Sequence, residues 1–216
     1  MPRRARTHGS GTEPSTTLRS EQVEATRRAV LAAARAAFGR NGYAQTSLDE
    51  IAAAARVTKG AVYHHFAGKK ALFRAVYSEV EAEAVARTAA AAAANVSGSP
   101  IDQIVAGVNS YLDVALDEEV QQITLIDGPT VLGLEPEGPA DEQPGHLALR
   151  SFIASAIGDG QITDLDPAIL AHLVGGLSLL GGLLIARAGD PDATRATVGQ
   201  ALDTMLRAAL APGSAP

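Results

Sequence analysis

Residues 46–73 read TSLDEIAAAARVTKGAVYHHFAGKKALF, and the pattern of this segment is the strongest indication of the fold. It holds two short helical patterns, 48–55 and 59–66, separated by a turn of three residues. Ser47, followed three positions later by Glu50, forms a capping box that starts the first pattern. Two short helices joined by such a turn predict a helix-turn-helix.

The second of these helices concentrates hydrogen-bonding side chains on its outward side. Lys59, His64 and, near one edge, Tyr63 lie there, and Gly60 lets the backbone approach a groove wall closely. A thin helix with polar tips and free N–H groups at its N-terminus meets the requirements of a recognition helix. A metal site at His64 and His65 is not expected, because neighbours on a helix point about 100° apart and helical metal pairs are spaced i, i+4.

The charge distribution also points to a polyanion at the N-terminal half. The 216-residue chain has a net charge of −6, yet up to residue 87 it carries 14 Lys and Arg against 8 Asp and Glu, and beyond that 4 against 16. A basic front half indicates contact with nucleic acid, although segregated, solvated helix faces would give the same asymmetry.

Composition excludes several other classes. The absence of cysteine removes disulfides and thiolate metal sites and fits a reducing, cytoplasmic location. No secretory leader is recognised, and the apolar run 174–186 is too short and too glycine-rich to span a bilayer easily. We therefore expect no membrane contact and no cofactor.

Helical patterns account for the rest of the chain. Residues 1–20 are polar and arginine-rich, which is typical of a disordered basic tail. A helix then runs from Glu21 to the Asn41-Gly42 pair, and a long one begins at Gly68. Ser99, Asp166 and Asp190 each precede a proline, which predicts helices over roughly 101–117, 167–187 and 191–210. Further helices are expected near 119–126 and 146–158, with a Gly/Pro-rich stretch at 127–145. No window alternates like a strand, so the predicted fold class is all-α.

The segment FGRNGYAQTSLDEIAAAARVTKGAVYHHFAGKKALF, residues 38–73, resembles the DNA-binding region of TetR-family transcriptional regulators. The resemblance covers about residues 25–75 and includes Phe-x-x-x-Gly-Tyr and Lys-Gly-x-x-Tyr-x-His-Phe followed by lysine. The later segment IDGPTVLG, residues 126–133, also resembles a motif of one branch of that family. The resemblance implies an all-helical homodimer with a three-helix DNA-binding domain at 21–68, a ligand-binding and dimerisation domain at 69–211 and a disordered tail at 212–216.

The resemblance also implies which residues contact DNA. Thr46 and Ser47 would face phosphate at the start of one helix, and Lys69 would bind phosphate at the start of another. Thr58, Lys59, Gly60 and Ala61 would face the groove. Tyr63 and His64 would touch the DNA backbone or base edges, and His65 would lie beside them near the phosphates. The family usually has glycine where this chain has Arg56, and a positive φ there would cost arginine about 1 kcal/mol relative to glycine.

For the C-terminal half, the resemblance implies an effector pocket and a dimer interface. The pocket candidates by family topology are Tyr111, Ile123, Leu132, Phe152 and Leu177. Small residues recur at helical spacing in 167–187 and the last helix has an apolar stripe, which favours a four-helix bundle of two subunits over an intramolecular core. The expected interface residues are Ala171, Gly175, Ser178, Gly182, Val198, Leu202 and Met205.

These features together predict a dimeric repressor that binds a palindromic double-stranded operator and releases it when a small molecule binds. An activator of the same fold is the alternative within this class. From a different class, an enzyme or ligand carrier with a vestigial basic domain is a rival. An enzyme is not expected, because the nearest approach to a nucleophile elbow, around Ser178, lies in a helical pattern and its second glycine is displaced.

Overall fold

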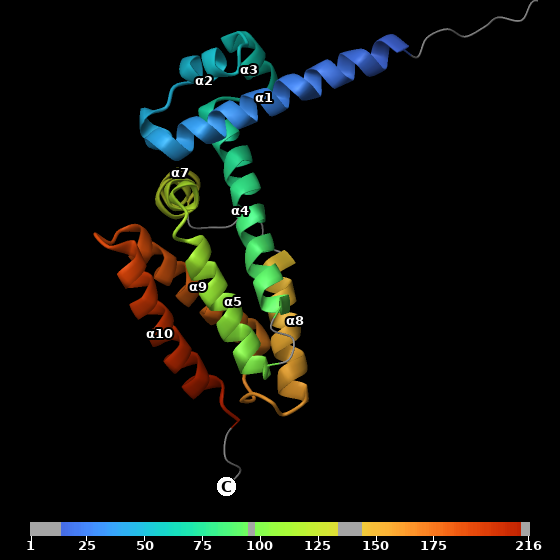
Figure 1. Ribbon diagram of the computed structural model, residues 1–216. Helices are drawn as coiled ribbons and strands as arrows, with labels where there is room; N and C mark the ends of the chain where they lie inside the picture. The colour runs from blue at the N-terminus through green and yellow to red at the C-terminus, as the bar shows by residue number, and fades with distance from the viewer. Residues whose placement is uncertain (1–13, 95–97, 134–143, 213–216) are drawn as a thin grey trace, which may run out of the picture.

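The computed structural model describes residues 14–94, 98–133 and 144–212, and every regular element in these ranges is a helix (Figure 1). The all-α prediction is therefore confirmed. The N-terminal part comprises α1 (Pro14–Gln45), α2 (Leu48–Ala54) and α3 (Lys59–His65), followed by the long α4 (Lys69–Ala94). The remaining helices are α5 (Pro100–Val114), α6 (Glu118–Val120), the π-helix η1 (Gln121–Asp127), α7 (Gly128–Leu132), α8 (Pro144–Gly158), α9 (Pro167–Ala186) and α10 (Pro191–Leu210).

Local capping sets the helix starts that the sequence predicts. The Ser99 hydroxyl accepts from the Asp102 N–H and the Asp102 carboxylate accepts from the Ser99 N–H, so α5 opens on a capping box. Asp166 and Asp190 cap α9 and α10 in the same way, through first-turn N–H groups. Each cap is followed by a proline, which has no N–H to leave unpaired.

Two boundaries differ from the prediction. Helix α1 already begins at Pro14, so residues 14–20 are helical and not part of a disordered tail; residues 1–13 and 213–216 lie outside the described ranges. Helical winding is interrupted at Gly42, with φ 74° and ψ 167°, and resumes for a few residues up to Gln45. The Gly/Pro-rich stretch 127–145 contains the short helix α7, and its residues 134–143 are not described.

The helices pack around two hydrophobic clusters joined by α4. In the first, α1, α2 and α3 enclose fully buried Phe38, Ile51 and Val62, and the Phe38 ring meets Phe73 of α4 edge to face. This cluster also takes in side chains of α6 and η1. The second cluster lies among α5, α8, α9 and α10. Helix α4 leaves the first cluster and runs down beside α5 into the second half of the molecule (Figure 1).

Candidate DNA-binding surface

Helices α2 and α3 are each started by a side-chain cap, of which the one at Ser47 was predicted. Ser47 Oγ accepts from the Glu50 N–H at 3.2 Å and Glu50 Oε2 accepts from the Ser47 N–H at 2.8 Å. The bonds to Ser47 lower the pKa of the Glu50 carboxyl. Thr58 Oγ1 accepts from the Ala61 N–H and so caps α3. The capping box, predicted from spacing alone, is confirmed.

The turn between α2 and α3 has the strained conformation that its departure from the family pattern implies. Arg56 has φ 56°, and among the described residues it is the one non-glycine position with positive φ. An arginine in this region costs about 1 kcal/mol relative to glycine. The Arg56 side chain is exposed, three residues before the start of α3.

The outward face of α3 carries the polar groups of the predicted recognition helix. Lys59, Gly60 and His64 are exposed, and Tyr63 is 53% exposed although it is a large aromatic residue. Ala61 and His65 are half-buried at the sides. On the opposite face, Val62 is completely buried. An aromatic ring, an imidazole and a bare glycine backbone on one thin helix suit contact with base edges and phosphates.

In the free protein, Lys59 forms an ion pair with an acidic side chain, and this pair was not predicted from the sequence. Lys59 Nζ lies 2.8 Å from Asp49 Oδ2, and this hydrogen bond raises the pKa of the lysine. Both side chains are exposed, so the pair is screened and contributes little to stability. Binding of Lys59 to DNA would exchange one acceptor oxygen for another.

Lys69 is held at the start of α4 by the last residues of α1. Its Nζ lies 4.2 Å from the centre of the Tyr43 ring and 3.4 Å from the Ala44 carbonyl oxygen. The Tyr43 ring in turn contacts Phe73 edge to face at 5.1 Å. The ammonium group therefore lies on an aromatic platform, and its charge interacts with Glu50 in the first turn of α2.

Thr46 is the one predicted contact whose side chain the structure removes from DNA. It is only 2% exposed, and its hydroxyl donates to the Gly42 carbonyl at 2.8 Å. This bond closes the kink of α1, so the prediction that the Thr46 side chain faces phosphate is wrong. Ser47, the next residue, remains exposed.

Comparison with known proteins agrees with this geometry. The model of bacterial regulatory proteins of the tetR family matches residues 30–76, and that of tetracyclin repressor-like C-terminal domains matches residues 101–209, half of the chain. The chain belongs to the TetR family of transcriptional regulators. The resemblance seen in the sequence is thus confirmed, as is the expectation that the chain is a DNA-binding regulator and not an enzyme.

Individual relatives extend over almost the whole regulator. A TetR-family regulator from Pectobacterium atrosepticum, of known structure, is 34% identical with a TM-score of 0.76, and the match covers 88% of this chain and 96% of that one. UidR of Escherichia coli K12 is 26% identical over 86% of this chain and 93% of its own. AibR, solved with isovaleryl coenzyme A and operator DNA, shares the fold at 24% identity and a TM-score of 0.56, over 83% of this chain and 97% of AibR.

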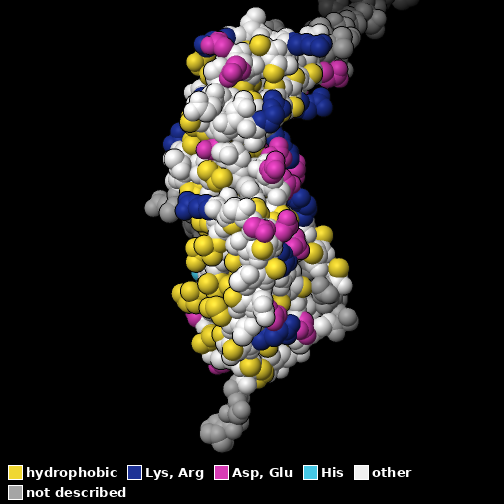
Figure 2. Space-filling view, turned by 60° about the vertical axis from the view of Figure 1, so that its left-hand side comes forward, with side chains coloured by type: hydrophobic (Ala, Val, Ile, Leu, Met, Phe, Trp, Pro, Cys, Tyr) yellow, Lys and Arg dark blue, Asp and Glu magenta, His cyan; other side chains and the backbone are white. Residues whose placement is uncertain are grey.

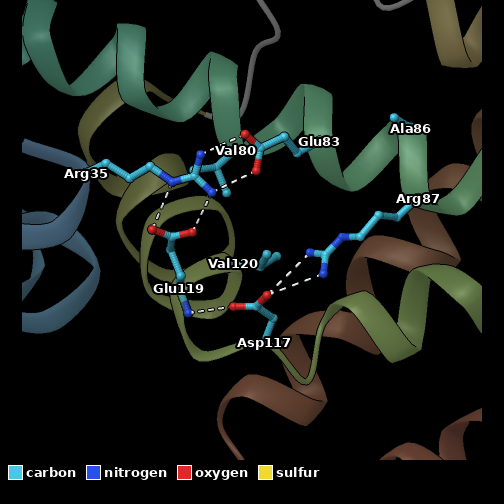
Figure 3. A pocket seen from close by; sticks show the side chains of 8 residues that line it. All are labelled: Arg35, Val80, Glu83, Ala86, Arg87, Asp117, Glu119 and Val120. Atoms are coloured by element: carbon cyan, nitrogen blue, oxygen red, sulfur yellow. Dashed lines mark hydrogen bonds and ion pairs between the residues drawn. The ribbon is translucent and has the colours of Figure 1, made fainter. Parts of the chain in front are cut away.

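A network of ion pairs joins the DNA-binding head of this TetR-family regulator, as we call α1, α2 and α3 together, to its C-terminal half (Figure 3). Arg35 of α1 bonds Glu83 of α4 and Glu119 of α6, each at 2.7 Å, and both bonds raise the pKa of the arginine. Beside it lies a cavity of about 320 Å³ that also reaches Arg87 and Asp117. The charges lining this cavity are paired with one another, and none of the predicted effector residues lines it.

The structure does not gather the predicted effector residues into one cavity. Ile123 and Leu132 pack with the first hydrophobic cluster, whereas Tyr111, Phe152 and Leu177 pack against the second. The five predicted pocket residues therefore divide between the two clusters.

A half-buried polar cluster between α4 and α5 was not foreseen from the sequence. The Tyr77 hydroxyl donates to Glu81 Oε1 at 3.2 Å. Burial raises the pKa of the Glu81 carboxyl, and burial, with the nearby Glu81 charge, raises the pKa of Tyr111 to about 12. A helical period identifies which residues share a face, but not that α5 covers this one.

Helix α9 turns the opposite face outward from the one expected at the dimer interface. Ala171, Ser178 and Gly182 are buried within the subunit, where the Gly182 position lies against Tyr111, so the prediction is wrong for them and for the buried Leu202 of α10. The small size of Ala171, Ser178 and Gly182 brings α9 close to α5 of the same chain. Gly175, Val198 and Met205 keep exposed or half-buried positions. The exposed face of α9 instead carries Ile169, Leu173, Leu180 and Leu184, each 52–61% exposed.

Helix α9 is also longer and more apolar than the run 174–186 indicates. Within its 20 residues, an 18-residue window has a mean hydropathy of 2.1, and 39% of that window is buried, so by length and composition alone the helix could cross a membrane. Its buried face packs on α5, α8 and α10, as a core helix does. Within the described ranges, no three His, Cys, Asp or Glu side chains form a group that could hold a metal.

Proposed function

We propose that this TetR-family regulator is a cytoplasmic repressor that binds a palindromic operator as a homodimer and leaves it when a small molecule binds. One observation carries the proposal: α4 is a single helix from Lys69, which contacts the end of α1, to Ala94 in the C-terminal half. A helix of 26 residues spans about 39 Å. A displacement at its C-terminal end therefore moves the start of α4 and, with it, the position of Lys69.

The homodimer is supported by the exposed apolar stripe on α9. Ile169, Leu173, Leu180 and Leu184 follow the spacing i, i+4, i+11, i+15, and the exposed Met205 of α10 adds to the apolar surface. Figure 2 shows hydrophobic side chains gathered along one side of the lower half of the molecule. An apolar surface of this kind on a water-soluble chain marks an interaction site. Two copies pairing α9 and α10 about a two-fold axis would cover it as a four-helix bundle.

Two-fold symmetry sets the form of the operator. An isologous dimer presents two copies of α3, and these read two half-sites in inverted order. Their centres should lie about 34 Å apart, one turn of the duplex, or a multiple of this. We assign groove contact to Thr58, Lys59, Gly60 and Ala61, contact with the DNA backbone or base edges to Tyr63 and His64, and phosphate contact to Ser47, His65 and Lys69.

Release by an effector requires that the ligand distinguish two conformations of the subunit. Moving a population from 1:99 to 99:1 takes about 5.5 kcal/mol of differential affinity. We place the effector among α4, α5, α8 and α9, where Tyr111, Phe152 and Leu177 lie at the edge of the second cluster. AibR, which has the same fold, was solved with both a coenzyme A thioester and operator DNA.

The test begins with selection of duplexes from a random-sequence library by the purified protein. We expect an inverted repeat whose half-sites follow the spacing above; recovery of no preferred sequence would contradict the proposal. Metabolite pools are then screened for release of the selected duplex. A true effector must bind less tightly when the duplex is present, by the same factor by which it weakens DNA binding. Transcription from a promoter carrying the sequence separates a repressor from an activator.

A further inference from the structure

The carboxylate of Asp127 makes a contact that its own helix does not require. Asp127 ends η1 directly before Gly128-Pro129, and its own backbone is helical, so the winding passes from η1 into α7 without a free helix start that needs a cap. The Asp127 side chain makes no cap bond to α7. Instead, Asp127 Oδ2 accepts a hydrogen bond from the main-chain N–H of Tyr43 at 2.6 Å. The two residues are 84 positions apart in the sequence, with Asp127 in the C-terminal half, which we call the regulatory half, and Tyr43 in the DNA-binding head.

The π-helical winding of η1 prepares this oxygen. Gln122 Nε2 donates to the same Asp127 Oδ2 at 2.9 Å. Residues five apart lie close together in a π-helix, whose bonds run i→i+5, whereas an α-helix turns them away from each other. π-Helical segments are uncommon and are found frequently at functional sites. The carboxylate is thus oriented by its own element and directed toward α1.

The receiving end of the contact is the segment that carries the platform of Lys69. Tyr43 is the first residue after the break in α1 at Gly42, and its ring lies 4.2 Å from Lys69 Nζ. Gly42 leaves the space: a Cβ built there would lie 2.9 Å from Gln122 Nε2 and 3.3 Å from Asp127 Oδ2, and its φ of 74° disfavours any side chain. The glycine therefore lets the Asp127 carboxylate approach the Tyr43 main chain without a side chain between them.

We propose that Asp127 is a positioning residue for DNA binding: it holds the Tyr43 main chain, and through the Tyr43 ring it sets where Lys69 presents its charge. Hydrogen bonds to a carboxylate are shorter and stronger than neutral ones, and this one joins the regulatory half directly to a DNA-contacting segment. A change in η1 would therefore reach Lys69 without movement of α3. The proposal rests on the assignment of Lys69 to phosphate.

The test compares Asp127→Ala and Asp127→Asn with the unaltered protein, each with and without Lys69→Ala. The probes are a duplex selected by the unaltered protein and, separately, a random-sequence duplex at low salt. Thr130→Ala is the control, because the Thr130 side chain bonds only within its own helix turn, to the Ile126 carbonyl. Gly42→Ala disrupts the same contact from the head. Circular dichroism and thermal unfolding report whether each variant is folded.

We expect Asp127→Ala to weaken binding to both duplexes by about tenfold, which is the loss typical of a charge-assisted hydrogen bond. The salt dependence of its DNA binding should approach that of the Lys69→Ala protein. Asp127→Asn should lie between, because its amide oxygen still accepts a hydrogen bond. In the Lys69→Ala background the loss should shrink to less than twofold, since coupled residues are not additive. Gly42→Ala should reproduce the loss and Thr130→Ala should not.

Other outcomes separate the two levels of the argument. Unchanged DNA affinity and salt slope in folded Asp127→Ala, or the same loss with and without Lys69, would overturn the positioning role. If Asp127→Ala does not fold, Asp127→Asn and Gly42→Ala decide by the same comparison. If no duplex is selected at all, the proposed operator fails, while the random-sequence duplex still tests Asp127, because phosphate contact does not depend on sequence.

Discussion

Lys69 Nζ lies 4.2 Å from the centre of the Tyr43 ring, so the first charged group of α4 is ordered by the end of α1. A cation over an aromatic face gains about 0.5–1 kcal/mol at an exposed site. An ordered lysine also loses less side-chain entropy when it binds a phosphate than a freely moving one does. Neither effect depends on base sequence.

Replacing Lys69 with alanine should therefore weaken binding to all duplexes about equally. We expect the slope of log affinity against log salt to fall by roughly one, because one phosphate per subunit is no longer neutralised. Fluorescence anisotropy at several salt concentrations measures both quantities. Arg150→Ala, which removes an exposed charge from α8, is the matched control and should leave the slope unchanged. An unchanged slope in Lys69→Ala would exclude Lys69 from the DNA contact.

Replacing Gly60 with alanine should separate stability from function. A Cβ at Gly60 would meet only Thr58 Oγ1, at 3.8 Å, so the free protein has room for it. Alanine favours a helix over glycine by up to about 1 kcal/mol, so the melting temperature should rise. DNA affinity should fall, because the methyl group would stand between α3 and the groove wall. Gly158→Ala, in open space at the end of α8, should leave DNA binding unchanged. Full affinity in Gly60→Ala would mean that α3 does not approach DNA at this residue.

Replacing Leu180 with aspartate should dissociate the dimer without unfolding the subunit. Leu180 is 54% exposed on α9, so the charge remains hydrated in the monomer, but in the bundle it would be buried without a partner. Sedimentation at micromolar concentration should give the mass of one chain, with unchanged helical circular dichroism. Val85→Asp, on an exposed apolar residue of α4, should remain a dimer. If the unaltered protein already sediments as a monomer, the α9–α10 interface is wrong.

Replacing Glu81 with glutamine should stabilise the protein in a manner that depends on pH. Burial raises the pKa of the folded-state carboxyl above its ordinary 4.5, so the folded state binds the proton more tightly than the unfolded chain does. Above the folded pKa the half-buried carboxylate costs stability, and this cost disappears as the pH falls through the folded pKa toward 4.5. The Tyr77 hydroxyl can still donate to glutamine.

Thermal unfolding between pH 4.5 and pH 8 measures this effect. At pH 8 the Glu81→Gln protein should melt a few degrees higher than the unaltered one, and the difference should vanish near pH 4.5. Glu79→Gln, exposed on the same helix, should show no such trend. A constant difference across this range would mean that the carboxyl does not titrate with a raised pKa.

Features that depend on neighbouring residues in the chain were correctly predicted from the sequence. The helix starts at Ser99, Asp166 and Asp190 follow from a cap oxygen beside a proline, and the helix-turn-helix follows from a capping box and two short periodic segments. The exposed face of α3 also follows, because a helical period places Val62 and His64 on different sides. Capping and periodicity act over a few residues, so no tertiary information is needed to recognise them.

Only the tertiary structure decided which partner each face and each polar group meets. A helical period shows that α9 has two stripes, but α5 and α10 determine that the one with Ser178 lies inside and the one with Leu180 lies outside. Thr46 is buried because the chain folds back at the α1 kink. Asp127 accepts a hydrogen bond from the Tyr43 N–H across 84 residues. Such a contact cannot be recognised from local residue spacing, since it arises from the packing of η1 against α1.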